Sequence, residues 1–269
     1  MPEKNVVDNT IKPNSITTLK DDFTRLGVKS GDIIIMHSSL SKIGWIIGGS
    51  VALIKAIMEV LTPEGTLVMP AHTGDNSEPS YWKYPPVPED WWELIRNEMP
   101  AYEPEIAPTR GIGIVAETFR KWTNVYRSEH PSMSFAAWGK NAKFITQGHK
   151  IGMDLGEASP IAKIYELKGQ ILLLGVTHES NTSLHLAEYR SDFTGKKYQI
   201  NGSAMIRDGK REWVEWEELD IDSDDFEKIG DDFEKEYEII KGKVGLADAH
   251  LVSQPKIVDY AVEWMKKNR

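Results

Sequence analysis

The sequence predicts a single α/β domain in which apolar strands alternate with amphipathic helices. The run of four branched residues from Ile171 to Leu174 is typical of a strand that is covered on both faces. An apolar strand at 32–36, a helix at 50–61 and a second strand at 66–69 form a βαβ-like unit. With 269 residues the chain can bury a sizeable core, and no linker divides it. We therefore expect one α/β domain over residues 1–269.

The first elements are justified by apolar spacing and by the residues that end each run. A helix is expected over 15–26, because Leu19, Phe23 and Leu26 form one apolar stripe and Gly27 can end it. The βαβ-like unit follows, with a glycine-containing loop before its helix. The polar segment that comes next, rich in Pro and Trp, predicts an inserted loop with a short helix that could cover a substrate cleft. That insertion spans residues 73–108.

The later elements are read in the same way. We expect a glycine-containing helix start and helix over 109–122, and a helix over 161–167 that Gly169 ends. After the strand at 171–174 comes a helix that carries His and Glu residues. Asp208-Gly209 is a strong signal for a tight hairpin turn between strands at 203–206 and 212–216. An amphipathic helix at 257–265 closes the chain.

Composition excludes several classes of protein. The absence of cysteine rules out disulfides, cysteine zinc sites and a cysteine acyl-enzyme. No apolar stretch approaches the roughly 18 residues that a membrane-spanning helix needs. Residues 1–5 are polar and lack the apolar core of a secretory signal, so we expect a cytoplasmic protein.

The net charge of −9 is concentrated in one segment. Between Glu215 and Glu238 there are 13 acidic residues against two lysines, so the rest of the chain is close to neutral. This distribution disfavours a nucleic-acid groove, which needs a strongly basic face. It permits an anionic cofactor on one side and a cationic substrate on the other. A solvated acidic surface is the alternative explanation.

Thr182, His185 and Glu188 are spaced three residues apart, which places them on one broad face of a helix. A histidine titrates near neutral pH, and a carboxylate bonded to its far nitrogen fixes its tautomer and raises its basicity. The pattern therefore suggests a general base. The alternatives are a histidine satisfied within the core and a Glu188 that lies on the surface of the helix.

Two metal sites were considered and neither is supported. His178 and His185, with Glu179 or Glu188, lack the i, i+4 histidine spacing of metalloprotease helices. The acidic series at 220–231 resembles a calcium loop, but its sixth position is aspartate where glycine is required. We therefore predict no metal site.

Two short segments bracket the loop between the first strand and the following helix. They are His37-Ser38-Ser39-Leu40 and Gly48-Gly49-Ser50. Backbone amides at such a helix start bind phosphate oxygens well, although an ordinary glycine turn explains the pattern equally. Ser159-Pro160 opens a later helix in a way that capping alone explains.

Taken together, these segments resemble the antibiotic N-acetyltransferase family, that is, the aminoglycoside 3-N-acetyltransferases and their close bacterial relatives. The resemblance covers nearly the whole chain, and its motifs occur in one order. They lie at 28–70, 108–111, 127–131, 155–160 and 174–188.

The resemblance implies a three-layer α/β/α fold with a mixed sheet, unlike the common GNAT acetyltransferase fold. It implies acetyl-coenzyme A as donor and an amine of an aminoglycoside-like substrate as acceptor. His185 matches the family's catalytic histidine, Thr182 and Glu188 fall on the same motif, and Glu218 or Asp220 are the nearest matches to its supporting carboxylates. Coenzyme binding is expected of His37, Ser38, Ser39, Leu40, Gly49, Ser50, Arg110 and Ser159. The acceptor side is expected to involve Glu157, His178 and Glu179.

The mechanism expected from this resemblance is direct transfer in a ternary complex, with His185 as general base. A backbone amide or the Thr182 hydroxyl would stabilise the oxyanion. Three rival hypotheses are an acetyltransferase for a non-antibiotic amine, a non-catalytic coenzyme-binding protein and a metal-dependent hydrolase.

Overall fold

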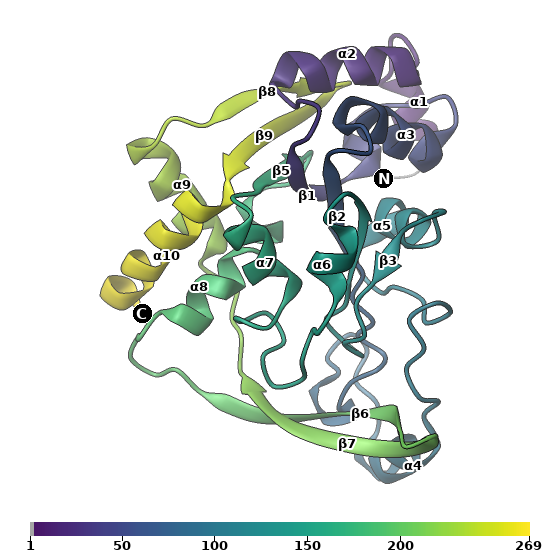
Figure 1. The fold of residues 1–269 in the computed structure, drawn as a ribbon, viewed down its shortest axis with the longest axis vertical. Coiled ribbons are helices and arrows are strands. Elements are labelled where there is room, and N and C mark those ends of the chain that lie inside the picture. Colours follow the sequence, from purple (N-terminus) through teal and green to yellow (C-terminus); the bar gives the residue numbers. More distant parts are fainter. Residues whose placement is uncertain (1–2) are drawn as a thin grey trace.

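The central sheet has seven strands in the order β3-β4-β2-β1-β5-β9-β8 (Figure 1). This arrangement comes from a computed structural model that describes residues 3–269. The strand β1 lies between two parallel neighbours, β2 and β5, whereas the remaining pairs are antiparallel, so the sheet is mixed as predicted. The strands are β1 (Ile33–Ser38), β2 (Thr66–Pro70), β3 (Tyr126–Arg127), β4 (Phe135–Gly139), β5 (Gln170–Leu174), β8 (Ile240–Val244) and β9 (Ala247–Ser253).

Helices cover both faces of this sheet, which confirms the three-layer α/β/α prediction. In β5, Leu172 and Leu174 face one apolar core while Ile171 and Leu173 face the other. The first core is shared with α2 (Ile16–Leu26), α3 (Gly49–Leu61) and α5 (Gly113–Arg120). The second is shared with α6 (Ala142–Thr146), α7 (Pro160–Glu166), α8 (Leu184–Arg190), α9 (Phe226–Glu236) and α10 (Gln254–Asn268).

The start and end of α2 follow the chemistry that the sequence indicates. Ser15 caps the helix by accepting from the Thr18 amide, and the Thr18 hydroxyl in turn accepts from the Ser15 amide. Gly27 ends the helix with a φ of 104°, a left-handed conformation that glycine adopts without strain. The predicted helix at 15–26 is confirmed.

A long hairpin lies apart from the central sheet. Its strands are β6 (Tyr198–Arg207) and β7 (Lys210–Leu219), joined by the predicted Asp208-Gly209 turn. Both turn residues have positive φ, as a two-residue hairpin loop requires. The inserted segment contains the short helix α4 (Trp92–Glu98). It lies against the hairpin, where the Tyr102 amide donates to Ala204 O at 2.9 Å (Figure 1).

Several features differ from the expectations. His37 and Ser38 are the last residues of β1 and not part of the following loop, and the edge hairpin β8–β9 was not predicted. The helix expected from residue 109 begins at Gly113. A short helix, α1 (Glu3–Asp8), precedes α2. None of the helices within residues 3–269 combines the length and apolar character that crossing a bilayer would need.

Candidate active site

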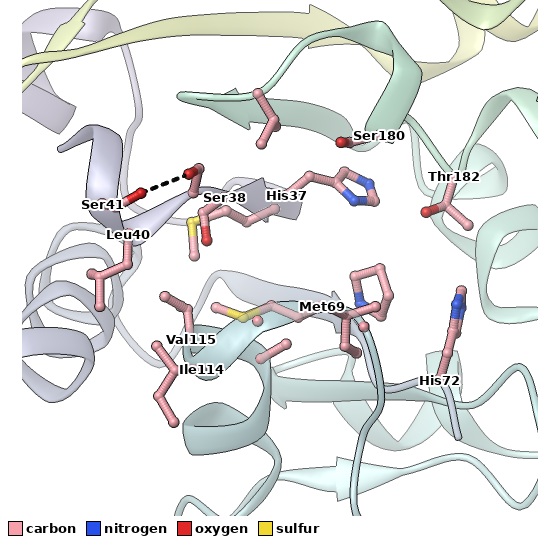
Figure 2. A pocket seen from close by; sticks show the side chains of 18 of the residues that line it. His37, Ser38, Leu40, Ser41, Met69, His72, Ile114, Val115, Ser180 and Thr182 are labelled. Atoms are coloured by element: carbon pink, nitrogen blue, oxygen red, sulfur yellow. Dashed lines mark hydrogen bonds between the residues drawn. The ribbon is translucent and has the colours of Figure 1, made fainter. Parts of the chain in front are cut away.

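A cavity of about 1010 Å³ opens at the carboxyl ends of β1, β2 and β5 (Figure 2). In an open α/β sheet this is where a crevice forms, because the chain leaves neighbouring parallel strands in opposite directions. The wall includes an apolar part with Met36, Met69 and Met133 and a polar part with several histidines and hydroxyl groups. Of the residues predicted for the site, those that line the cavity are His37, Ser38, Ser39, Leu40, Gly49, Glu179, Thr182 and His185.

His185 lies on this wall and is held by a buried carboxylate. Its Nδ1–H donates to Glu188 Oε2 at 2.5 Å, one helical turn further along α8. Only 1% of Glu188 is exposed, so it is not the surface residue that the sequence left possible. The other oxygen, Oε1, accepts from Arg269 Nη1 at 2.6 Å and from the Asp222 amide at 2.9 Å. With its proton on Nδ1, His185 is left with an Nε2 lone pair that can accept a proton.

Thr182 does not belong to the same helix as His185, contrary to the spacing argument. The helix α8 begins at Leu184, and Thr182 lies in the turn before it, where its carbonyl accepts from the His185 amide at 3.2 Å. The side chain of Thr182 nevertheless lines the cavity (Figure 2). Thr182 and His185 therefore line the same cavity, although it is the turn before α8, and not the helix, that places Thr182 on the wall.

Two further histidines line the cavity in the neutral form. Burial lowers the pKa of His37 to about 4 and is the main cause that lowers the pKa of His72 to about 3. Within the described structure, the Nε2 atom of each is buried without a hydrogen-bond partner. His72 was missed by the sequence reasoning, although its place directly after β2 was the available signal.

Helix starts form part of the cavity wall, and Ile114 in the first turn of α5 lies across the cavity from Thr182 (Figure 2). Gly48 and Gly49 begin α3, and Gly111 and Gly113 lead into α5, so the first amide groups of both helices adjoin this space. Free amides and the positive end of the helix dipole favour an anion there. Ser50 points elsewhere, because its hydroxyl bonds to Thr118 Oγ1 at 2.9 Å.

Three other predicted site residues lie outside the cavity wall. Arg110 forms an ion pair with Asp75, and Glu157 forms one with Arg190. Ser159 is fully buried at the start of α7. The corresponding predictions of coenzyme or substrate contact are not supported by this placement, since motif spacing says nothing about the direction of a side chain.

His178 also lies away from the cavity. Its ring is buried against Gly230 of α9, and its Nε2–H donates to Glu234 Oε1 at 3.0 Å. His250 donates to the same oxygen at 3.0 Å, so donor atoms of a possible metal site lie together. Lys241 Nζ lies 2.5 Å from the second oxygen of Glu234, and the carboxylate is thereby satisfied without a metal. This burial does not support the acceptor-side role predicted for His178.

Glu218 is not the partner of His185, which corrects the sequence interpretation. It lies at the base of the hairpin, where it accepts from Asn201 Nδ2 at 3.0 Å and from Trp216 Nε1 at 3.1 Å. Burial and the neighbouring Asp154 raise the pKa of Glu218 to about 8. Burial alone would raise the pKa of Asp154 too, but hydrogen bonds from His130 and Glu218 hold it below its usual range. The surroundings of this pair therefore favour a protonated Glu218 beside an ionised Asp154.

Asp220 lies in a second hollow, of about 740 Å³, which meets the main cavity at Ile221. Its lining holds four consecutive or near-consecutive aspartates and three basic residues, Lys83, Lys197 and Arg269. The acidic members are Asp220, Asp222, Asp224 and Asp225. Of the long acidic segment, this short part borders the site.

Most of the chain matches a known protein family. The family model described as aminoglycoside 3-N-acetyltransferase matches residues 35–266. The chain belongs to the aminoglycoside 3-N-acetyltransferase family. Its members named as aminoglycoside N(3)-acetyltransferases are enzymes, so the predictions of the family and of an acyltransferase are confirmed.

Individual members of this acetyltransferase family match along their length. The SPbeta prophage-derived aminoglycoside N(3')-acetyltransferase-like protein YokD of Bacillus subtilis (strain 168) is 43% identical over 266 residues, covering 98% of this chain and 97% of the relative. Aminoglycoside N(3)-acetyltransferase III of Pseudomonas aeruginosa is 31% identical and covers 94% of each chain.

Solved structures agree with the sequence comparison. YokD superimposes with a TM-score of 0.96 over 98% of both chains. AAC-VIa bound to sisomicin, in a room-temperature neutron/X-ray structure, has a TM-score of 0.88 at 29% identity, covering 96% of this chain and 100% of the other. AAC-IIIb in a binary complex with CoASH has a TM-score of 0.86 at 28% identity, covering 95% and 97%. The acetyltransferase fold is therefore shared along nearly the whole chain.

Proposed function

We propose that this protein transfers the acetyl group of acetyl-coenzyme A to an amine of an aminoglycoside-like, cationic substrate. The observation that carries the proposal is the His185–Glu188 pair opening onto the cavity beside Thr182. Relatives at this level of similarity include one solved with CoASH and one solved with sisomicin. Because acetyl-coenzyme A is a metabolite of the cell interior, the proposed activity would operate in the cytoplasm.

His185 is the general base of the proposed reaction. As the substrate amine attacks the thioester carbonyl, His185 Nε2 takes its proton; the new C–N bond forms and the C–S bond breaks. The proton then passes to the departing thiolate, so no covalent enzyme intermediate is required. Glu188 holds the proton on Nδ1 and stabilises the imidazolium that forms during the transfer.

The developing oxyanion needs a hydrogen-bond donor on the cavity wall. The Thr182 hydroxyl is close to the base in sequence and in space, and His72, neutral because of its lowered pKa, offers an N–H that does not compete for the proton. A neutral imidazole is a suitable electrophile of this kind. Removing one good donor of an oxyanion costs about 3 to 4 kcal/mol in the transition state.

The two substrates approach His185 from different ends. The helix starts at Gly49 and Gly113 suit the phosphates of the coenzyme, with Ser38 and Ser39 beside them. The hollow bordered by Asp220 and Asp224 suits a cation, and it meets the cavity close to the base. The charge split in the sequence thus gives each substrate its own side.

The decisive experiment measures thiol release from acetyl-coenzyme A against a panel of aminoglycosides and unrelated amines. The absence of cysteine in the chain means that a thiol reagent reports only released coenzyme. We expect turnover with 2-deoxystreptamine aminoglycosides. Turnover only with other amines would overturn the substrate assignment, and coenzyme binding without turnover on any amine would overturn the enzymatic assignment.

A further inference from the structure

Arg269, which follows α10, is far from His185 in sequence, but both side chains bond to the same residue, Glu188. Its Nη1 donates to Glu188 Oε1 at 2.6 Å, and Glu188 Oε2 accepts from His185. We propose that Arg269 is a positioning residue for the base: it fixes the Glu188 carboxylate and thereby the orientation and tautomer of His185. This inference rests on the proposed function.

The guanidinium of Arg269 is itself held in a fixed plane. Asp225 accepts two hydrogen bonds, from Nε at 2.8 Å and from Nη2 at 2.6 Å, which is the bidentate geometry that suits arginine. Nη2 also donates to Asp222 O at 2.8 Å, and the Phe193 ring lies with its centroid 5.0 Å from Cζ. A lysine could make one of these contacts but not all of them.

Burial gives the contact with Glu188 its importance. A carboxylate that is 1% exposed is costly without charged or hydrogen-bonded partners. Burial by itself lowers the pKa of Arg269, but the carboxylates of Asp225 and Glu188 raise it by more. The pKa is therefore above its usual value and the arginine stays charged. The Arg269 and Asp222 bonds satisfy Oε1, which leaves Oε2 directed at His185 Nδ1.

The same side chain also lines the hollow that we assign to the acceptor. Asp222 and Asp225, which it ties together, form part of the acidic wall there. Arg269 thus connects the wall of the acceptor hollow to the carboxylate behind the base. Its loss is expected to disturb the base first, because His185 depends on Glu188 for its orientation.

The experiment compares Arg269→Gln and Arg269→Lys with wild type and with Lys266→Gln as the matched control. Lys266 lies in the last turn of α10, three residues before Arg269, and its replacement by Gln also removes one positive charge. Its ion pair is with Glu263 on the surface. We expect Arg269→Gln to lower kcat by about 10- to 100-fold, by analogy with the loss seen when the hydrogen-bond partner that orients a metal-ligating histidine is removed. Coenzyme binding and the KM for acetyl-coenzyme A should change little, and Arg269→Lys should recover part of kcat.

A double-mutant cycle with Glu188→Gln separates positioning from a general effect on folding. If Arg269 acts through Glu188, Arg269→Gln should have little further effect once Glu188 is Gln. Additive losses, or a folded Arg269→Gln variant with wild-type kcat, would overturn the proposal. Thermal unfolding of each variant shows whether it is folded.

A readout without turnover keeps this test independent of the proposed function. In protein with ¹⁵N-labelled histidine, the nitrogen shifts of His185 should show the proton on Nδ1 in wild type and in Lys266→Gln, and a mixture of tautomers in Arg269→Gln. An unchanged Nδ1–H tautomer in Arg269→Gln would contradict the inference. If no amine is acetylated by wild type, the proposed function fails while this spectrum still decides the role of Arg269.

Discussion

His185 and Glu188 are separated by one helical turn, yet they meet different surroundings. His185 faces the cavity, whereas Glu188 is buried among groups that come from two later segments of the chain. A histidine whose Nδ1 is bonded to a buried carboxylate and whose Nε2 is free has the arrangement of a general base. Removing the imidazole should therefore remove most of the catalytic rate.

Replacing His185 by Ala should lower the rate of acetyl transfer by about 10²- to 10⁴-fold, the usual contribution of general-base catalysis. Coenzyme affinity should stay close to wild type, since the helix starts that suit its phosphates are untouched. Thiol release measures the first effect and calorimetric titration with coenzyme the second. An acetylation rate equal to wild type would eliminate His185 as the base.

The neutral histidines of the cavity predict a loss of stability in acid. Because the folded-state pKa of His37 and His72 is about 4 and about 3, the unfolded chain binds protons below pH 6.5 that the folded chain does not. Stability should therefore fall as the pH drops from about 6.5 towards 4, by about 3 kcal/mol for each residue on these pKa values.

Denaturant unfolding of wild type and of His72→Gln between pH 7 and pH 4 tests this. The variant should lose less stability than wild type over that range, because one of the buried histidines that gain a proton only on unfolding is gone. Equal acid sensitivity of the two proteins would contradict the assignment for His72.

At the site, the sequence identified what is local and missed what is distant. Thr182, His185 and Glu188 lie within seven residues, so spacing and the family motif were enough to single them out. Arg269 reaches Glu188 across 81 residues of sequence, and nothing in a local pattern encodes such a contact. His178 and Glu218 were misplaced for the same reason, since the direction of a side chain depends on packing against α9 and the hairpin.

Among the secondary-structure elements, β5 was predictable and β8 was not. The run in β5 is buried on both faces and so is continuously apolar, whereas β8 is an edge strand whose residues from Ile240 to Lys243 are exposed. The helix α9 did carry a signal, because Phe226, Ile229 and Phe233 share one face within the acidic segment. The three apolar residues are outnumbered by charged residues in α9, so its composition alone is typical of a solvated segment.

The close contact between α9 and His178 can be tested by adding a methyl group at Gly230. A Cβ at Gly230 would overlap the His178 ring, so Gly230→Ala should destabilise the protein by about 1 to 3 kcal/mol, as overpacking does. Alanine is the better helix former, so propensity alone predicts the opposite sign. Gly74→Ala is the matched control, because nothing lies within 4 Å of a Cβ there and the backbone is unstrained. A stabilised Gly230→Ala variant would show that the helix does not pack on His178 in this way.

For the whole molecule, the net charge of −9 matters through its placement and not its size. The aspartates at 220–225 border the hollow assigned to the acceptor, whereas the lining residues of that hollow include none from α9. That only this short part of the acidic segment adjoins the site could not be known before the fold was available. The prediction of a single domain over 1–269 stays a prediction.

Acceptor binding should weaken as salt is added. Raising the ionic strength from about 0.1 M to about 1 M shortens the screening length from about 10 Å to about 3 Å, which reduces the attraction between a polycation and the wall. The dissociation constant of an aminoglycoside, measured by calorimetry at both salts, should rise. Asp224→Asn should weaken binding at low salt, whereas Asp231→Asn, on α9 and outside the hollow, should not. A dissociation constant that is the same at both salt concentrations would show that the aspartates do not attract the acceptor electrostatically.

The apolar part of the cavity can be oxidised even though the chain contains no cysteine, because it includes methionines. Met36, Met69 and Met133 line the space between the strand ends, and Met133 is only partly buried. Peroxide converts a thioether into a polar sulfoxide, which is larger and prefers water. A chain with no thiol to oxidise therefore still has an oxidisable side chain on the wall of its candidate active site, and Met133 is the most accessible of the three.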